Sequence, residues 1–306
     1  MDLCYLLKEE SKKLYNTMKA AQELDIKIQE ETLTELMLIN LKASIQENTE
    51  ENTEENIQKK GLNTVIKHCN KSDEFNLGTD FLWFVGSKKK NSWVAFYIQA
   101  KKLRENQKYF LKHNYKNKTG NESAPIIRQV DKLITAAQDI HLGNKDRRSA
   151  IPIYCFYNYL NDETLKAADY LNDFLHISKK KEEFSFTYTS AYHVRSLLNQ
   201  PFSAKQGTTK NTFPFSDLKG FPIYTLFCHT NTNQSLANHI FNTYKSFHTK
   251  LFSDRDSNYR FLLNDNEYIF PELPPFVESL IEDSKDTSGK YDEKDLPSYI
   301  MVTYED

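Results

Sequence analysis

The sequence predicts an α/β fold, in which strands and helices alternate along the chain. Residues 81–85 and 93–101 are apolar, aromatic-rich segments of strand length, joined by a turn rich in Gly, Ser, Lys and Asn. Residues 151–157 form a continuous apolar run, which is typical of a central strand buried on both faces. Between them, residues 125–141 carry apolar side chains at the spacing of a helix that covers a sheet. This order predicts a βαβ unit with parallel strands.

Two helices and a strand are expected before this unit. Residues 3–24 and 32–46 carry Leu, Met and Ile at helical spacing among polar residues, and each predicts an amphipathic helix. Residues 47–60 are acidic, repeat Asn, Thr and Glu, and lack apolar periodicity, which predicts a loop. Residues 62–68 alternate in polarity, as a strand does.

The chain beyond residue 158 continues the alternation. The expected elements are helices at 162–176, 190–199, 234–251 and 275–281, and strands at 184–189, 221–229 and 296–304. We therefore divide the chain into an N-terminal helical segment (residues 1–30), an α/β core (31–230) and a partly irregular C-terminal extension that packs on the core (231–306).

The composition limits the class of protein. The 306 residues carry a formal net charge of −2, so contact with nucleic acid must rely on local basic patches. The 8 glycines form no dinucleotide-binding motif. No segment approaches the roughly 20 apolar residues of a membrane span, and no signal peptide is evident, so a cytoplasmic protein is expected. The cysteines lack zinc-ligand spacing and are expected to be reduced and mostly buried: Cys4, Cys69, Cys155 and Cys228.

Residues suited to metal and phosphate chemistry lie at one end of the expected hairpin. Asp80 precedes the first strand, and Gln99 and Lys101 end the second on one common face. Oxygen ligands suit Mg²⁺ or Mn²⁺, which orients a phosphate and lowers the pKa of a bound water, and a neighbouring lysine stabilises charge on phosphorus. This pattern indicates a phosphodiesterase site with Asp80, Gln99 and the Ala100 carbonyl as ligands. A polar hairpin with solvent-facing ends is the alternative.

Gly78-x-Asp80 followed by Gln99-x-Lys101 resembles the core of the PD-(D/E)xK, or restriction-endonuclease-like, nuclease superfamily, in the variant in which glutamine replaces the second acid. The chain is also similar to an uncharacterised bacterial family within that superfamily. It departs from that family's pattern at Phe81, Phe215 and Glu35. The segments that carry the similarity are residues 31–35, 74–80, 99–101, Gln129, residues 152–158 and residues 213–215.

The resemblance implies a restriction-endonuclease-like core, with a mixed central sheet flanked by helices, and a Mg²⁺- or Mn²⁺-dependent endonuclease. It implies that Asp80 and Gln99 hold the metal with help from Glu31, and that Lys101 positions the water or stabilises the transition state. Glu74 and Glu35 become candidates for supporting roles around these ligands. As alternatives, Glu31 is an acid that favours a helix start, and Glu74 is a surface acid in a turn.

A basic, aromatic stretch follows Lys101. Lys102, Arg104 and Lys108 are interleaved with aromatic residues, which suits contact with a nucleic-acid backbone, while a solvated loop is the alternative. By the resemblance, Gln129 near the start of the expected helix also points to the site; the alternative is a glutamine on a helix surface.

These observations predict a metal-dependent endonuclease. By analogy with the superfamily, DNA is favoured over RNA, and an effector of defence against phage, a regulatory protein partner and a homodimer are expectations of the same kind. One alternative is a nuclease-fold module that binds nucleic acid or a partner protein without cutting, which the glutamine at position 99 and the near-neutral charge favour. Another is a nuclease directed at RNA, such as transfer RNA.

Overall fold

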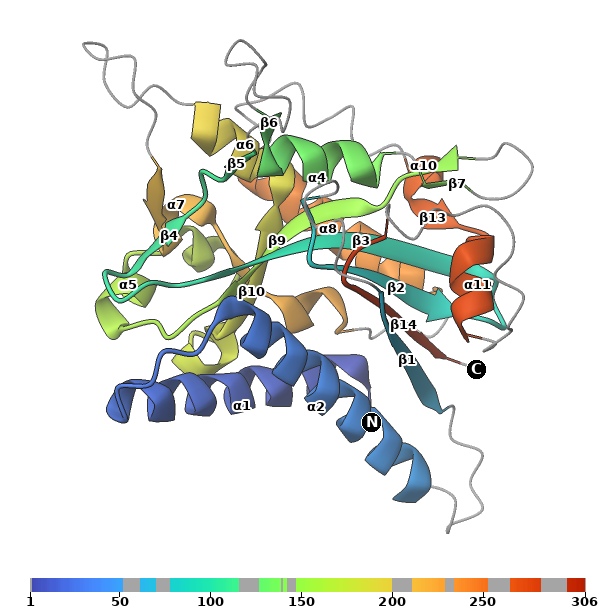
Figure 1. The fold of residues 1–306 in the computed structure, drawn as a ribbon, viewed down its shortest axis with the longest axis horizontal. Coiled ribbons are helices and arrows are strands. Elements are labelled where there is room, and N and C mark those ends of the chain that lie inside the picture. Colours follow the sequence, from blue (N-terminus) through green and yellow to red (C-terminus); the bar gives the residue numbers. More distant parts are fainter. Residues whose placement is uncertain are drawn as a thin grey trace.

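The computed structural model has an α/β fold built on a mixed sheet with helices around it (Figure 1). The structure describes residues 2–51, 61–69, 78–115, 127–138, 140–141, 147–199, 211–228, 234–252, 265–281 and 296–305. None of the helices within these ranges combines the length and apolar character needed to cross a membrane.

The main sheet has the strand order β1-β14-β2-β3-β9-β10-β12, with β13 paired to β3. Its pairs β14–β2 and β3–β9 are parallel and its other pairs are antiparallel, so the sheet is mixed, as expected. The strands are β1 (Leu62–His68), β2 (Phe81–Ser87), β3 (Ser92–Lys102), β9 (Ile151–Tyr157), β10 (Phe186–Ser190), β12 (Phe221–Pro222), β13 (Ile269–Phe270) and β14 (Tyr299–Glu305). Smaller pairs join β4 (Lys108–Phe110) to β11 (Thr212–Pro214), β5 (Asn114–Tyr115) to β6 (Ile127–Arg128), and β7 (Ile140–His141) to β8 (Arg147–Arg148).

Helices flank this sheet. The α-helices are α1 (Leu3–Glu23), α2 (Glu30–Glu51), α4 (Gln129–Ala137), α5 (Asp162–Lys166), α6 (Ala191–Asn199), α7 (Phe215–Leu218), α8 (Leu236–Phe252), α10 (Asp265–Tyr268) and α11 (Pro275–Ile281), and the 3₁₀ turns are η3 (Asp169–Asp173), η4 (Lys181–Phe184) and η5 (Ile223–Leu226). Helix α4 contacts β3 and β9, α8 contacts β2 and β3, and α2 contacts β1 and β3. In Figure 1, α1 and α2 lie together below the sheet and α4 lies above it.

The strands at the centre of the sheet, including those that carry the candidate site, are almost entirely buried. Every residue of β2 and β9 is buried, and so are the first nine residues of β3. Strands covered on both faces favour continuous apolar runs, and β2 and β9 have this composition. The expected βαβ unit is confirmed as β3, α4 and β9, because β3 and β9 are parallel neighbours.

Two expected elements were wrong in ways that the sequence explains. The strand expected at 221–229 ends at Pro222, which lacks an N–H for the ladder, and the 3₁₀ turn η5 follows. The helix expected at 162–176 ends at Lys166 and is followed by η3. The reason is visible in the buried apolar side chains, whose three-residue spacing suits a 3₁₀ turn better than an α-helix: Leu165, Ala168, Leu171 and Phe174.

Two other expected helices had wrong bounds. Helix α4 begins at Gln129 rather than in the segment before it, because Ile127 and Arg128 pair with β5 as β6. Helix α2 continues through Glu51, so part of the acidic segment expected as a loop is helical, and residues 52–60 lie outside the described ranges.

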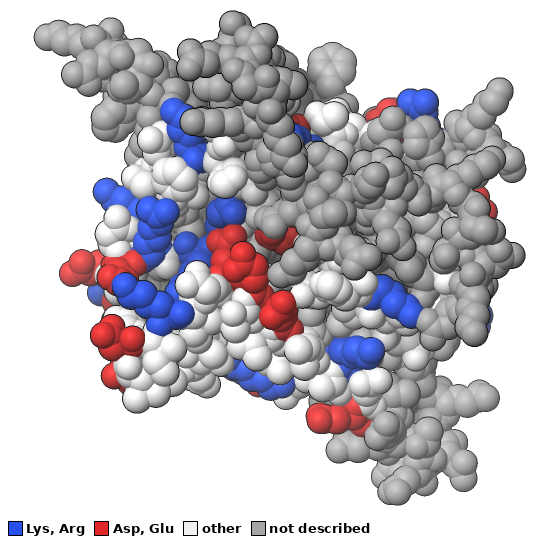
Figure 2. All heavy atoms as spheres, in the orientation of Figure 1, with Lys and Arg blue, Asp and Glu red and all other residues white. Residues whose placement is uncertain are grey.

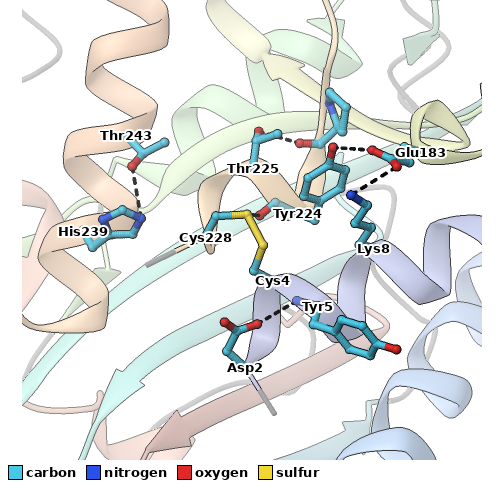
Figure 3. Close-up of a disulfide and its surroundings, with 11 residues drawn as sticks. Asp2, Cys4, Tyr5, Lys8, Glu183, Tyr224, Thr225, Cys228, His239 and Thr243 are labelled. Atoms are coloured by element: carbon cyan, nitrogen blue, oxygen red, sulfur yellow. Dashed lines mark hydrogen bonds and ion pairs between the residues drawn. A yellow bond between two sulfur atoms is a disulfide. The ribbon is translucent and has the colours of Figure 1, made fainter. Parts of the chain in front are cut away.

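The expectation of four reduced cysteines was wrong for two of them, whereas Cys69 and Cys155 are free as expected. Cys4 and Cys228 form a disulfide across a sequence separation of 224 residues, and Figure 3 shows that it joins α1 to the segment after η5. Beside it, Glu183 accepts a hydrogen bond from the Tyr224 hydroxyl at 2.7 Å and pairs with the Lys8 ammonium at 3.1 Å. The first helix is therefore fixed to the core by a covalent bond and an ion pair. Nothing in the spacing of two cysteines so far apart could have indicated their pairing.

Candidate functional site

The β2–β3 hairpin brings the candidate residues together as expected. The register pairs Phe81 with Ile98, and the Asp80 N–H donates to the Ile98 carbonyl at 2.8 Å. Asp80 therefore lies beside Gln99, one residue outside the described ladder. The first turns of α2 and α4 supply two further residues, Glu30 and Gln129, to the same end of the sheet.

Gly78 sets the approach of this hairpin to α4. Its φ is +64°, a left-handed conformation that favours glycine, and a Cβ at this position would lie 2.8 Å from the Gln129 carbonyl oxygen. The next residue, Thr79, is buried and its hydroxyl donates to the Ile98 carbonyl at 2.8 Å. Gly78 thus allows its own backbone to lie close to the start of α4, and Asp80 follows two residues later.

Asp80 and Gln99 are joined directly. The Gln99 Nε2 donates to Asp80 Oδ2 at 2.6 Å and lies 3.1 Å from the Ala100 carbonyl oxygen. The Ala100 N–H donates to the same carboxylate oxygen at 2.6 Å. Asp80 is half-buried, whereas the Gln99 side chain is 1% exposed, so these bonds form in a largely water-free environment. Charge-assisted bonds of this kind fix both side chains strongly.

Gln129 lies behind this pair. It is 3% exposed, and its Nε2 donates to Gln99 Oε1 at 2.8 Å. Its backbone N–H donates to the His113 carbonyl at 2.9 Å, which holds the first residue of α4 in place. The structure thus turns Gln129 toward the site, as the resemblance implied, and its polar atoms contact Gln99.

Lys101 is held by an acid that sequence reasoning missed. Its Nζ lies 3.0 Å from Glu30 Oε1, and Glu30 Oε2 accepts the Lys102 N–H at 2.8 Å. The Lys101 side chain is 15% exposed and that of Glu30 is 29% exposed, so the pair is only partly screened by water. The adjacent Glu31, which the resemblance implies as a metal ligand, is exposed. The helix starts at Glu30, and a prediction that placed its start there could have distinguished Glu30 from Glu31.

The remaining acids are placed differently. Glu35 accepts a hydrogen bond at 2.7 Å from the Tyr299 hydroxyl on β14, and burial together with this bond raises the pKa of Tyr299 to about 12. Glu74 lies outside the described residues. Among the residues that the structure describes, no three His, Cys, Asp or Glu side chains gather as a possible metal site. A cation here would therefore depend on Asp80, the Ala100 carbonyl and the Gln99 amide oxygen.

Two buried titratable groups on β9, the strand next to β3, lie near the candidate site and take no part in its proposed chemistry. Burial raises the pKa of Tyr157 well above 10, and its hydroxyl donates to Thr34 Oγ1 at 3.0 Å. Burial likewise raises the pKa of the Cys155 thiol, and the charge of Asp80 adds to the effect. Both groups stay protonated at neutral pH, so neither serves as a general base or a thiolate nucleophile.

A family comparison covers the whole of this site. A model described as a family of unknown function, DUF6615, matches residues 3–305. The chain belongs to the DUF6615 family. Neither the curated proteins nor the solved structures gave a match.

A groove of about 550 Å³ runs beside the site in this DUF6615 protein. Two segments line it: residues 27–30, which lead into the start of α2, and residues 102–106, which begin at the last residue of β3. Figure 2 shows cations and acids interspersed on the side of the molecule where β4 and the α1–α2 turn lie in Figure 1. The lining of the groove likewise contains both signs of charge: Lys27, Glu30, Lys102, Arg104 and Glu105.

The cations expected to contact nucleic acid differ in their availability. The Lys102 ammonium donates to the Ile28 carbonyl at 2.7 Å and fastens the groove's two walls together. Arg104 and Lys108 are exposed, with the Arg104 guanidinium 4.9 Å from the centre of the Phe110 ring. Tyr109 between them is fully buried and its hydroxyl donates to Asn158, so that its ring does not present a face for a base.

Proposed function

We propose that this protein is a metal-dependent endonuclease that hydrolyses phosphodiester bonds, with DNA as the favoured substrate. The observation that carries the proposal is the convergence of the Asp80 carboxylate, the Ala100 carbonyl and the Gln99 amide within hydrogen-bonding distance, next to Lys101. The mixed sheet and the resemblance of this hairpin to restriction-endonuclease-like nucleases support the same function.

The donor set suits a hard divalent cation. Two oxygens, from Asp80 and Ala100, lie 2.6 and 3.1 Å from a single point now taken by the Gln99 nitrogen. Mg²⁺ or Mn²⁺, when bound, would orient the phosphate and lower the pKa of an attacking water. Few protein ligands are enough, because Mg²⁺ ordinarily retains several waters.

Lys101 is the cation that would face the phosphate. Glu30 holds its ammonium at 3.0 Å, so the side chain is oriented before substrate arrives. In this position Lys101 would neutralise the negative charge that develops on the phosphorane oxygens, and Glu30 would act as its positioning residue. Arg104 and Lys108, both exposed, would bind backbone phosphates beyond the scissile bond.

One observation favours a second candidate function. The NH₂ group of Gln99 donates to both the Asp80 and the Ala100 oxygens. Oxygens held by a side-chain amide in this way also suit a module that keeps a nuclease fold for binding nucleic acid or a partner protein. The two functions differ in their dependence on metal.

The deciding experiment is a cleavage assay on plasmid, linear DNA and total RNA, with Mg²⁺ or Mn²⁺ and with chelator. The test variants are Asp80→Asn and Lys101→Met. Their matched controls are Asp131→Asn, on the surface of α4, and Lys90→Met, at the opposite end of the same hairpin, where the ammonium donates to the Gln234 carbonyl at 3.0 Å.

We expect metal-dependent cutting by the wild type and both controls, and a loss of about 10²- to 10³-fold in both test variants, as for removal of one group that stabilises transition-state charge. Whether DNA or RNA is cut names the substrate. Binding of nucleic acid with no cutting by the wild type would favour the binding module. Cutting that persists in both test variants would refute this placement of the site.

A further inference from the structure

The Gln99 amide stands where a cation would bind. Its nitrogen lies 2.6 Å from Asp80 Oδ2 and 3.1 Å from the Ala100 carbonyl oxygen. Both of these atoms are acceptors, so only a donor or a cation is stable between them. The amide oxygen must therefore point the other way, and it accepts the Gln129 Nε2 at 2.8 Å. In this orientation Gln99 offers a donor, and not an oxygen ligand, to the candidate metal position.

We propose that Gln99 and Gln129 form a pair of amides whose orientations both reverse when a cation binds, that is, a paired amide switch. The inference rests on the metal site of the proposed function. When a cation enters between Asp80 and Ala100, the Gln99 amide turns over, so that Oε1 faces the cation and the NH₂ group faces Gln129. Gln129 then turns in the same way, and its amide oxygen accepts that NH₂ group.

Burial requires the two rotations to be coupled. The Gln99 and Gln129 side chains are 1% and 3% exposed, so water is largely excluded as a substitute partner. A turned Gln99 that faced the NH₂ group of an unturned Gln129 would set two donors against each other. A buried amide without its hydrogen bond is costly, and the pair therefore moves together.

The surrounding structure fixes the backbone position of Gln129. The backbone of Gln129 is held by its N–H bond to the His113 carbonyl and by its close approach to Gly78. The terminal torsion of a glutamine is broad and nearly two-fold, so an amide can turn over without moving the rest of the side chain. The two amides can therefore exchange donor and acceptor in place.

A double-mutant cycle on cation affinity tests the coupling. Mn²⁺ affinity is measured by calorimetry for the wild type, Gln129→Glu, Gln99→Met and the double variant. A carboxylate at position 129 accepts only, so it favours the metal-binding orientation of Gln99. With Gln99→Met there is neither an amide to turn nor a second carboxylate, so the carboxylate at position 129 contributes only its charge, which the cycle cancels.

We expect Gln129→Glu to increase Mn²⁺ affinity about tenfold more in the wild-type background than in the Gln99→Met background. Equal gains in both backgrounds, with Mn²⁺ still bound, would overturn the switch and leave the metal site standing. Absence of Mn²⁺ binding in all four proteins would refute the metal site of the proposed function, and the switch with it.

A spectroscopic measurement on the wild type gives an independent readout. The side-chain NH₂ signals of both glutamines are assigned in ¹⁵N-labelled protein from their loss in Gln99→Glu and Gln129→Met. On titration with Mg²⁺ we expect the two pairs of signals to shift together with one apparent Kd. A shift of the Gln99 signals alone would overturn the coupled rotation, while a reporter at Gln138, at the other end of α4, should stay unchanged.

Discussion

Replacing Gly78 with alanine tests whether the backbone approach that sets Asp80 against α4 is as close as the structure indicates. The residue has a φ of +64°, and an added Cβ would lie 2.8 Å from the Gln129 carbonyl oxygen. That oxygen belongs to the backbone of the first residue of α4 and cannot rotate away. The substitution must therefore strain Gly78, displace α4, or do both.

The expected cost follows from three terms. The left-handed conformation costs alanine about 1–2 kcal/mol, and the forced contact adds about 1–2 kcal/mol, at the lower end of what overpacking costs. The reduced freedom of the unfolded chain offsets about 0.4–1 kcal/mol. Gly78→Ala should therefore lower the free energy of unfolding by about 2–3 kcal/mol. At about 2 °C per kcal/mol for a chain of this size, the Tm should fall by about 5 °C.

Gly220→Ala is the matched control. Its Cβ would lie 3.0 Å from Phe215 Cε2 and 3.3 Å from Thr187 Oγ1, both of which are side-chain atoms, and its φ is not in the left-handed region. We expect it to change the free energy of unfolding by less than about 1 kcal/mol. Urea unfolding and thermal scans of both variants measure the difference. Equal effects of the two substitutions, within 0.5 kcal/mol, would refute the reasoning about Gly78.

Other predictions concern stability. Asn158 is fully buried and donates to the Phe184 carbonyl at 2.7 Å; Asn158→Leu should cost about 3 kcal/mol in urea unfolding because several buried groups lose their partner, and a cost below 1 kcal/mol would contradict this. Burial lowers the pKa of His193 to about 4 and of His248 to about 3. Both histidines titrate near 6.5 in the unfolded chain, which therefore binds more protons than the folded chain below that pH. Each histidine should remove about 2 kcal/mol from the free energy of unfolding between pH 7 and pH 5, and His248→Leu should reduce this dependence on pH. Reduction of the Cys4–Cys228 disulfide should lower the free energy of unfolding by about 2–5 kcal/mol, with no such effect of reductant on the Cys4→Ser variant.

The strands of the hairpin and β9 were predictable because their composition admits little else. Aromatic and β-branched residues fill them, and the structure buries these runs on both faces. The meeting of Asp80 with Gln99 followed from the same pattern, because a tight hairpin fixes which residues lie opposite each other. Local composition and short-range pairing therefore predicted the centre of the site.

Features that depend on distant contacts were not predictable. Glu30 instead of Glu31 reaches Lys101 because α2 begins two residues earlier than its apolar pattern indicated, and helix starts are the least certain feature of such patterns. The Cys4–Cys228 bond depends on the docking of α1 against η5, which no local pattern encodes.

The position of β14 has a consequence for synthesis on the ribosome. This strand, the last described segment of the chain, lies between β1 and β2 and pairs with both. Until residues 299–305 have emerged, β2 has an open edge on the side away from β3, and β1 has no neighbour in the sheet. Pairing across more than 200 positions in sequence is slow and comes late in folding. A nascent chain would therefore carry the Asp80 hairpin without its finished sheet, and the activity proposed for this site would begin only after residues 299–305 are made.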